Sequence, residues 1–362
     1  MAHQVEKMVF TGRKPWWYGN QHQGAAVGVD LGENAITSEV AMKEAGLDWQ
    51  VTKARAGWLD PSAQTIDGAP VWRPAEGEVF LLRDSDRSVL GRATDDYQPF
   101  QNAEAFRFLD GLVEDGSLLY HTAGSLEMGK RVWILAQTPE SWTIRRRSGD
   151  LNHHHAFLLV MLGHDGKTGI TIMPTDIRAE CANTCGFADT KAQAENLILR
   201  VAHSGDVAGK MEFAARAIEQ LGAQSLERRK ILQELAQLSM DTDSFIDLAT
   251  ETFLKLTGSE EEIREAAYLW YEKATPLSKT KLENKVAEVT KLFTGGIGAE
   301  GNSAYDAVQA FTQYFDHFDI GKTRDQIEAG KRAAKAVKSS WLDAGAERKR
   351  LVWKRLAERV RR

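Results

Sequence analysis

Apolar and polar residues alternate, or form short apolar runs between turn residues, along roughly the first 190 positions of the chain. Alternation with a period of two is typical of half-buried β-strands. A first strand is predicted over Asp48–Ala54. Three hairpins are predicted after it, because Asp, Ser and Gly between the paired runs adopt turn conformations readily. The hairpins pair Glu78–Arg83 with Ser88–Ala93, Tyr120–Leu126 with Arg131–Gln137, and Ala156–Leu162 with Gly169–Met173.

The hydrophobic period changes to that of a helix at one place within this strand-rich part. Phe106, Leu109, Leu112 and Val113 recur at helical spacing. Asn102 stands before them and can act as the N-cap, because Asn side chains accept hydrogen bonds from the first amides of a helix. The pattern therefore predicts one central helix that begins at Asn102.

Helical spacing dominates from about Lys191 to the end of the chain. Ser259 followed by Glu262 is a capping-box pattern. The candidate helices are Gln193–Ala202, Val207–Leu221, Ser225–Leu238, Ser244–Leu256, Ser259–Glu272, Lys279–Phe293, Ala304–Phe315 and Asp325–Val337. We predict an α+β fold: a twisted antiparallel sheet of hairpins with a central helix, followed by a mostly helical C-terminal half. The expected parts are a strand-rich core (residues 1–190), a helical part packed on it (191–320) and a basic helical tail (321–362).

Composition is that of an ordinary globular protein, with 43 % hydrophobic and 27 % charged residues among 362. No apolar run approaches the roughly 18 residues that a membrane helix needs. The opening MAHQVEKMVF lacks the pattern of a secretory signal. Cys181 and Cys185 are the two cysteines, which excludes a disulfide scaffold and fits a reducing compartment. We therefore expect a cytoplasmic protein.

Charge is distributed unevenly along the chain. Residues 321–362 hold fourteen Lys and Arg against five Asp and Glu, so this tail carries +9 while the remaining residues carry −14. Such asymmetry can mark a tail that binds nucleic acid or a partner protein, with Trp341 and Trp353 taking part. It is equally consistent with a helix that docks on the acidic body.

Several segments, in order, resemble one protein family. They are MAHQVEKMVFTGRKPWW, GLDWQV, LGRATDDYQPFQNAEAFRFLDGLV, YHTAGSLEMGKRVWILAQTP, GHDGKTGITIMPTDIRAECANTCGFA and AYDAVQAFTQYFDH. Together they resemble the phage/plasmid-like proteins of the domain-of-unknown-function family 932. The chain departs from the family pattern at Trp16-Trp17-Tyr18 and at Cys185. The resemblance implies a mobile genetic element in a bacterial host cell and implies no particular activity.

The sequence offers candidates for two kinds of enzyme site. The cluster His153-His154-His155 with His164, Cys181 and Cys185 offers zinc ligands, but consecutive side chains on a strand alternate between faces. The alternative is that the histidines are polar residues at the start of a strand and that the two cysteines are small residues of the core. Cys181 with His203, or a Ser with His164 and Asp165, offers nucleophilic catalysis, which only geometry can establish. His164-Asp165-Gly166 otherwise predicts a turn, in which Asp accepts from backbone amides and Gly adopts a positive φ.

Nucleotide-binding motifs give little support to an ATP-dependent function. Gly296-Ile297-Gly298-Ala299-Glu300-Gly301 matches G-x-G-x-x-G, but it follows a predicted helix instead of a strand. We interpret it as a linker between helices. The chain has no Walker lysine motif.

Basic residues recur at the hairpin turns and edges, with aromatic residues between them. Cations contact phosphates, and aromatic rings stack on bases without requiring a sequence. The alternative is that the aromatic residues belong to the core and the arginines are solvated or paired. The candidate nucleic-acid-binding residues are Lys130, Arg131, Trp142, Arg145, Arg146, Arg147, Lys167, Arg178 and Asn183.

The predicted architecture is similar to that of the single-strand annealing proteins that phages carry. We therefore predict a protein that binds single-stranded DNA and promotes strand annealing in recombination or replication, without catalytic residues, metal or cofactor. The expected partners are single-stranded DNA, further copies of the chain in a homo-oligomer such as a ring, and a host or phage recombination protein. One alternative is an interaction protein that binds a host protein. Another is an enzyme that depends on a metal or on Cys181.

Overall fold

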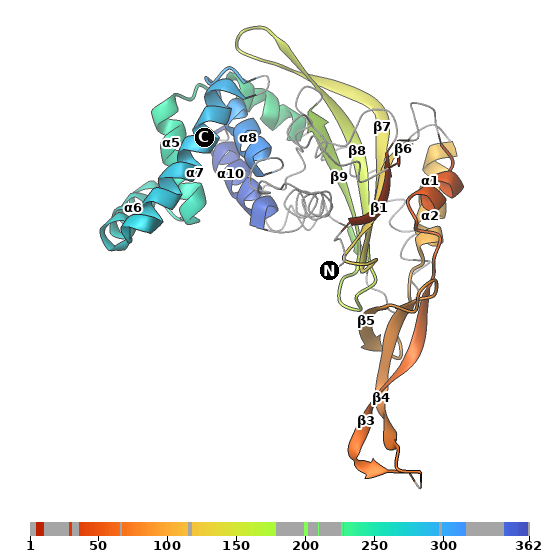
Figure 1. Ribbon diagram of the computed structural model, residues 1–362. Helices are drawn as coiled ribbons and strands as arrows, with labels where there is room; N and C mark the ends of the chain where they lie inside the picture. Colours follow the sequence, from red (N-terminus) through yellow and green to blue (C-terminus); the bar gives the residue numbers. More distant parts are fainter. Residues whose placement is uncertain are drawn as a thin grey trace.

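The structure is a computed structural model that describes most of the chain. The described residues are 5–10, 29–30, 36–65, 67–114, 118–178, 199–201, 209, 226, 228–296, 299–315 and 344–360. Strands fill the N-terminal half and helices fill the C-terminal half, as the sequence predicts (Figure 1). The chain is an α+β protein.

Within the described ranges, seven strands form one sheet in the order β10-β9-β8-β7-β6-β1-β2. The strands are β1 (Val5–Phe10), β2 (Val29–Asp30), β6 (Leu119–Leu126), β7 (Arg131–Arg145), β8 (Leu151–Gly163), β9 (Ile170–Arg178) and β10 (Leu199–Val201). Neighbours pair antiparallel except β1 with β2. The predicted hairpins β6–β7 and β8–β9 are confirmed, and β7 with β8 forms a third.

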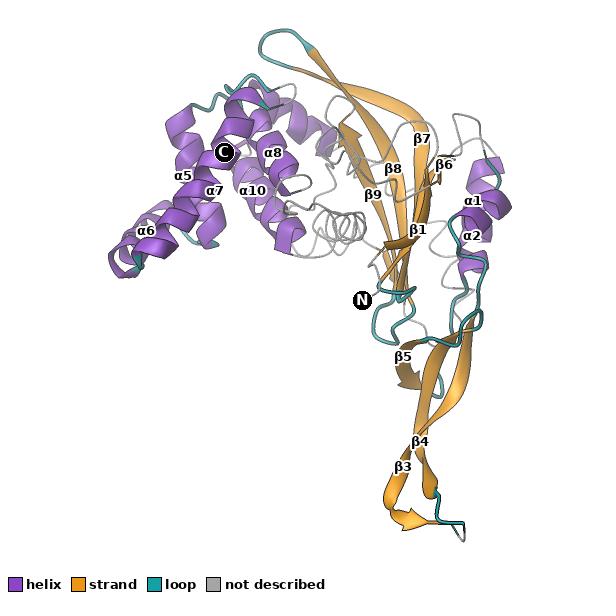
Figure 2. Cartoon of the chain, viewed as in Figure 1, coloured by secondary structure: helices purple, strands orange, loops and turns teal. Residues whose placement is uncertain are grey.

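A second sheet contains β3 (Val51–Gln64), β4 (Pro70–Arg83) and β5 (Val89–Thr94), in that order among the described strands. Its β4–β5 hairpin is the one predicted from Glu78–Arg83 and Ser88–Ala93. β3 is much longer than the predicted strand, which ended at Ala54. β3 and β4 extend together away from the body as a two-stranded arm (Figure 2).

Two helices cover one face of the large sheet: α1 (Ser38–Glu44) and α2 (Asn102–Glu114) (Figure 1). The core between these helices and the sheet contains Phe106 and Leu109 of α2 and the inward residues of β7 and β8, such as Ile134 and Val160. This α2 is the predicted central helix. Its apolar stripe is buried because the period of 3.6 residues places Phe106 and Leu109 on the side that faces the strands.

Asn102 does not cap α2 with its side chain, in contrast to the prediction. The side chain is fully buried, and its Nδ2 donates to the carbonyl of Leu47 at 3.1 Å. Its Oδ1 lies 2.9 Å from Nε2 of His164. Buried amide groups need hydrogen-bond partners, so Asn102 joins α2 to the segment before β3 and to the end of β8.

The C-terminal half is a group of helices on the other side of the sheet (Figure 1). The helices are residues 228–237, α5 (Thr242–Leu254), α6 (Glu260–Lys273), α7 (Pro276–Gly295), α8 (Ala304–Gln313) and α10 (Ala344–Val360). The capping box of Ser259 and Glu262 is confirmed. The prediction of a helix over Gln193–Ala202 is wrong at its end, because Leu199–Val201 pairs with β9. Val207–Leu221 and Asp325–Val337 lie almost wholly outside the described residues.

The described helices other than α6 share one apolar core that reaches into the strand half. Phe245 stacks on Phe293 with ring centroids 4.2 Å apart, and Ile144 of β7 joins the same core. The described end of the basic tail, α10, packs here too, with Trp353 only 1 % exposed. Trp353 is therefore buried within the protein and does not lie on a binding surface. No helix among the described residues is long and apolar enough to cross a membrane.

Candidate nucleic-acid interface

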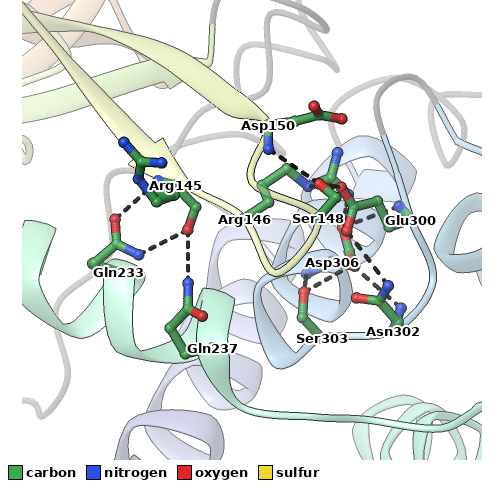
Figure 3. Close-up of polar contacts among 10 residues, drawn as sticks. All are labelled: Arg145, Arg146, Ser148, Asp150, Gln233, Gln237, Glu300, Asn302, Ser303 and Asp306. Atoms are coloured by element: carbon green, nitrogen blue, oxygen red, sulfur yellow. Dashed lines mark hydrogen bonds and ion pairs between the residues drawn. The ribbon is translucent and has the colours of Figure 1, made fainter.

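The tip of the β7–β8 hairpin is held against the helical half by its backbone. Gln233 donates to the carbonyl of Arg145 and accepts from its amide, at 2.8 and 2.9 Å, and Gln237 donates to the same carbonyl at 2.8 Å (Figure 3). Gln233 and Gln237 are four residues apart on one helix, so both point to the same side. The contact fixes the position at which the strand leaves the sheet.

Arg146 completes this attachment with a buried ion pair. Its guanidinium lies 2.8 Å from Asp306 and 3.1 Å from Glu300, and the Arg146 side chain is 6 % exposed (Figure 3). Asp306 also accepts from the hydroxyl of Ser303 at 2.7 Å. The cation of Arg146 is thus enclosed by carboxylates, as a buried charge requires. It is a buried group and not a surface group for phosphate.

Arg145 and Arg147, on either side of Arg146, are exposed. The turn from Arg146 to Asp150 is closed by two backbone hydrogen bonds: the amide of Arg146 donates to the carbonyl of Asp150 at 2.8 Å, and the amide of Gly149 donates to the carbonyl of Arg146 at 3.0 Å. Gly149 adopts a φ of 95°, a conformation that glycine reaches without strain. A short, closed turn therefore presents two guanidinium groups to solvent at the end of the hairpin.

Trp142, a candidate for stacking on bases, is half-buried and packs inside the protein. Its ring stacks on His154 at 4.4 Å, and the guanidinium of Arg229 lies over the ring at 5.2 Å. His154 is fully buried and lies 2.9 Å from the hydroxyl of Tyr305. Trp142 therefore helps to join β7 and β8 to the helical core.

Lys130, Arg131 and Lys167 lie at the opposite end of the same strands. Arg131 pairs with Gly163, whereas Arg145 pairs with Leu151 at the far end of β8. Fourteen residues of extended strand separate the two ends by about 45 Å. Lys167 is exposed, and Arg131 lies 3.8 Å from Glu127. The predicted basic residues thus form two sets, one at each end of the sheet.

The turn after β8 has the structure that the sequence predicts. Asp165 accepts hydrogen bonds from the amides of Lys167 and Thr168 at 2.9 and 2.7 Å, and Gly166 has a φ of 76°. Burial disfavours the charged carboxylate, but these hydrogen bonds outweigh it and hold the pKa of Asp165 below its ordinary value. The carboxylate stabilises a turn, and the side-chain hydroxyl that donates to it, at 2.9 Å, is that of Thr168.

The histidines alternate as expected for a strand. His154 is buried on one side, while His153 is exposed and His155 half-buried on the other. No group of three or more His, Cys, Asp or Glu side chains that could hold a metal occurs among the described residues.

Arg178, another candidate binding residue, is the last residue of β9 and pairs with His154 of β8. Asn183, Cys181, Cys185 and His203 lie outside the described residues, so their predicted roles stay predictions.

The glycine-rich segment joins two helices, as the sequence indicates. Gly296 is the C-cap of α7, and Ser303 is the N-cap of α8. Its Glu300 and the following Asp306 form the ion pair with Arg146. The segment therefore holds the β7–β8 tip, and no strand precedes it to direct its amides at a dinucleotide.

The residues that hold the tip were missed by sequence reasoning. The pattern Ser303-x-x-Asp306 marks the start of a helix and could have placed Asp306 in its first turn. The spacing of Gln233 and Gln237 could have placed both on one helix face. Neither pattern identifies the partner residue. Arg145 is 88 residues from Gln233, and Arg146 is 160 residues from Asp306.

These features define a class: an α+β protein whose sheet of hairpins is joined to a helical half by a buried ion pair. Residues 89–353 match the family model described as Domain of unknown function (DUF932), and the chain belongs to this family. The matched span begins at β5 and therefore leaves out the β3–β4 arm. No curated protein and no solved structure matches the chain.

Proposed function

We propose that the protein binds single-stranded DNA through the tip of the β7–β8 hairpin. The observation that carries the proposal is the exposure of Arg145 and Arg147 on a turn fixed by Arg146 and Gln233. A fixed turn lowers the entropy that is lost when a ligand orders the two arginines. Guanidinium groups also match phosphate geometry well.

A neighbouring helix adds to the positive charge at this tip. Lys230 is exposed and lies one turn before Gln233 on the helix that contacts Arg145. Arg229, next to it, packs over Trp142. Glu234 and Asp150 are exposed nearby in sequence, so the surplus of charge is small. We expect modest affinity that falls steeply with salt.

Lys130, Arg131 and Lys167 form a second basic set in this proposal. At about 45 Å from the tip they cannot share one short site with Arg145. They would contact a longer strand, or a second one, and two strands held by one protein are what strand annealing requires. We assign the activity to recombination or replication of phage or plasmid DNA, because the family resemblance implies the setting of a mobile genetic element.

The test is binding of a fluorescent single-stranded oligonucleotide by fluorescence anisotropy, with duplex DNA as competitor. The variant Arg145→Glu/Arg147→Glu removes both exposed cations of the tip, and we expect its affinity to fall at least tenfold. The control is Arg264→Glu/Lys273→Glu, which changes the charge by the same amount at two exposed cations of α6, and we expect its affinity to stay within about twofold. Equal losses in both variants would show that net charge alone, and not the tip, determines binding.

Annealing is a separate step and needs a separate readout. Two complementary strands, each with one dye of an energy-transfer pair, report pairing as transfer increases. We expect the protein to accelerate pairing without nucleotide. Lys130→Glu/Lys167→Glu would slow the pairing while leaving binding of one short strand unchanged. If single strands bind and pairing is not accelerated, the protein only binds them, and the annealing part of the proposal is wrong.

A further inference from the structure

The β3–β4 arm extends beyond the rest of the molecule (Figures 1 and 2). β5 pairs with β4 only between Glu78 and Leu82. From Gly57 and Pro74 outward, β3 and β4 therefore pair only with each other among the described strands. An isolated two-stranded hairpin is marginally stable in water, because it has no core to bury. The outer arm would gain stability from a surface that covers it.

Large apolar side chains on the outer arm are exposed. The exposed fractions are 56 % for Trp58, 61 % for Leu59 and 47 % for Trp72. Trp58 pairs with Arg73, and Leu59 pairs with Trp72. Successive residues of a strand point to opposite faces, so both faces of the arm carry an apolar group. Aromatic residues of this kind are enriched at protein interfaces.

The charges of the outer arm indicate a protein partner instead of DNA. Residues 57–74 contain one arginine, Arg73, and two acids, Asp60 and Asp67. A surface without net positive charge gains nothing from the release of counterions by DNA. The face that carries Trp58 also carries Arg73 and Asp60, whose charged groups lie 3.2 Å apart. One cation, one anion and one aromatic ring lie together there.

Such a face is complementary to itself. In a two-fold contact each copy presents the same surface, so a patch with one cation beside one anion meets opposite charges on its partner. We propose that the arm is a self-association surface, on which Arg73 contacts the partner's Asp60 and the Trp58 rings bury each other. The proposal goes beyond DNA binding and does not depend on it.

The size of the arm predicts a reversible dimer. The outer arm runs from Gly57 to Gln64 on β3, about 26 Å, and two strands are about 10 Å wide, so one face offers about 260 Å². Two arms together would bury about 520 Å², which is below the area of a stable specific interface. We therefore expect a weak dimer that dissociates on dilution, in the high micromolar range.

The experiment exchanges the charges of the proposed contact. Asp60→Arg gives an arm with two cations, and Arg73→Asp gives an arm with two anions. Each variant alone repels its own copy, whereas a one-to-one mixture restores an opposite pair at both contacts. Sedimentation velocity over a micromolar concentration series, without nucleic acid, should show a dimer for the wild type, monomers for each variant, and a dimer for the mixture.

Apolar variants test the same surface by another route. Trp58→Ser removes the ring from the proposed contact face and should weaken the dimer at least tenfold. The matched control is Tyr268→Ser, which removes an exposed aromatic ring from α6 and should leave the dimer unchanged. Circular dichroism of each variant shows whether the protein stays folded.

Three results would overturn the proposal. They are a wild-type protein that is monomeric throughout the concentration series, a dimer that survives every change in the arm, and a dimer that only the α6 variant disrupts. The second and third would place self-association on another surface. DNA binding by the same variants is measured separately, so failure of the arm proposal leaves the proposal for Arg145 and Arg147 standing.

Discussion

Arg146, at the tip of the β7–β8 hairpin, and Asp306, in the first turn of α8, form an ion pair of 2.8 Å although 160 residues separate them. The Arg146 side chain is 6 % exposed, and Asp306 is fully buried. The pair joins the strand half to the helical half and orients the turn that carries Arg145 and Arg147. Arg146 therefore joins the two halves of the protein and also positions the candidate binding residues Arg145 and Arg147.

Removing one partner of this pair should be costly. Arg146→Ala leaves Asp306 buried without its cation, and such losses lower the free energy of unfolding by about 3–5 kcal/mol. Chemical denaturation followed by circular dichroism measures the change. The control Arg147→Ala, at an exposed neighbour, should change stability by no more than about 0.5 kcal/mol. Equal effects of the two substitutions would contradict the buried pair.

The turn at Asp165 predicts a pH dependence with a definite sign. The pKa of Asp165 is lowered in the folded state, so its carboxylate stabilises the protein above its ordinary pKa of 3.8. This contribution is lost as the pH falls through the lower folded pKa. Asp165→Asn should cost about 1–2 kcal/mol at pH 7, and the difference from wild type should shrink below pH 4. A difference that does not change with pH would exclude the charge as the cause.

Gly166 tests how closely two hairpins approach. Its φ is 76°, and an added Cβ would lie 2.2 Å from the carbonyl oxygen of Arg92. Gly68 has nearly the same φ, 77°, but has open space around it. Both Gly→Ala variants incur about 1 kcal/mol of backbone strain, and only Gly166→Ala adds a clash. Thermal unfolding should show a clearly larger loss for Gly166→Ala; similar losses would mean that the two sheets are farther apart.

The basic tail is structural over its described helix. Trp353→Ala should lower the free energy of unfolding by about 3–5 kcal/mol, because it removes a large ring from the core of the helical half. Lys354→Ala, on the exposed side of α10, should have little effect. A Trp353 variant as stable as the wild type would show that α10 is not docked.

The hairpins were predictable because their signals are local. Alternation and turn residues such as Asp165-Gly166 lie within a few positions of each other, and the fold uses them directly. The outer arm was missed because Pro61, Pro70 and Gly57 argue against a strand. In a two-stranded arm these residues are tolerated, since most of its edge groups face solvent.

The candidate interface was only partly predictable. Three consecutive arginines have the same local pattern, and the sequence cannot show which of them points inward. That choice depends on Glu300 and Asp306, which are remote in sequence. The surroundings of Trp142 could not be predicted for the same reason. Arg229 and His154 pack against its ring only in the folded chain, and Tyr305 contacts His154 from a remote helix.

The most direct test of the central claim is the salt dependence of binding to single-stranded DNA. Each phosphate neutralised contributes about −0.7 to the slope of log affinity against log salt. If Arg145 and Arg147 each contact one phosphate, Arg145→Ala/Arg147→Ala should make the slope shallower by about 1.4 while Arg264→Ala leaves it unchanged. An unchanged slope in the double variant, or no binding even at low salt, would contradict the account.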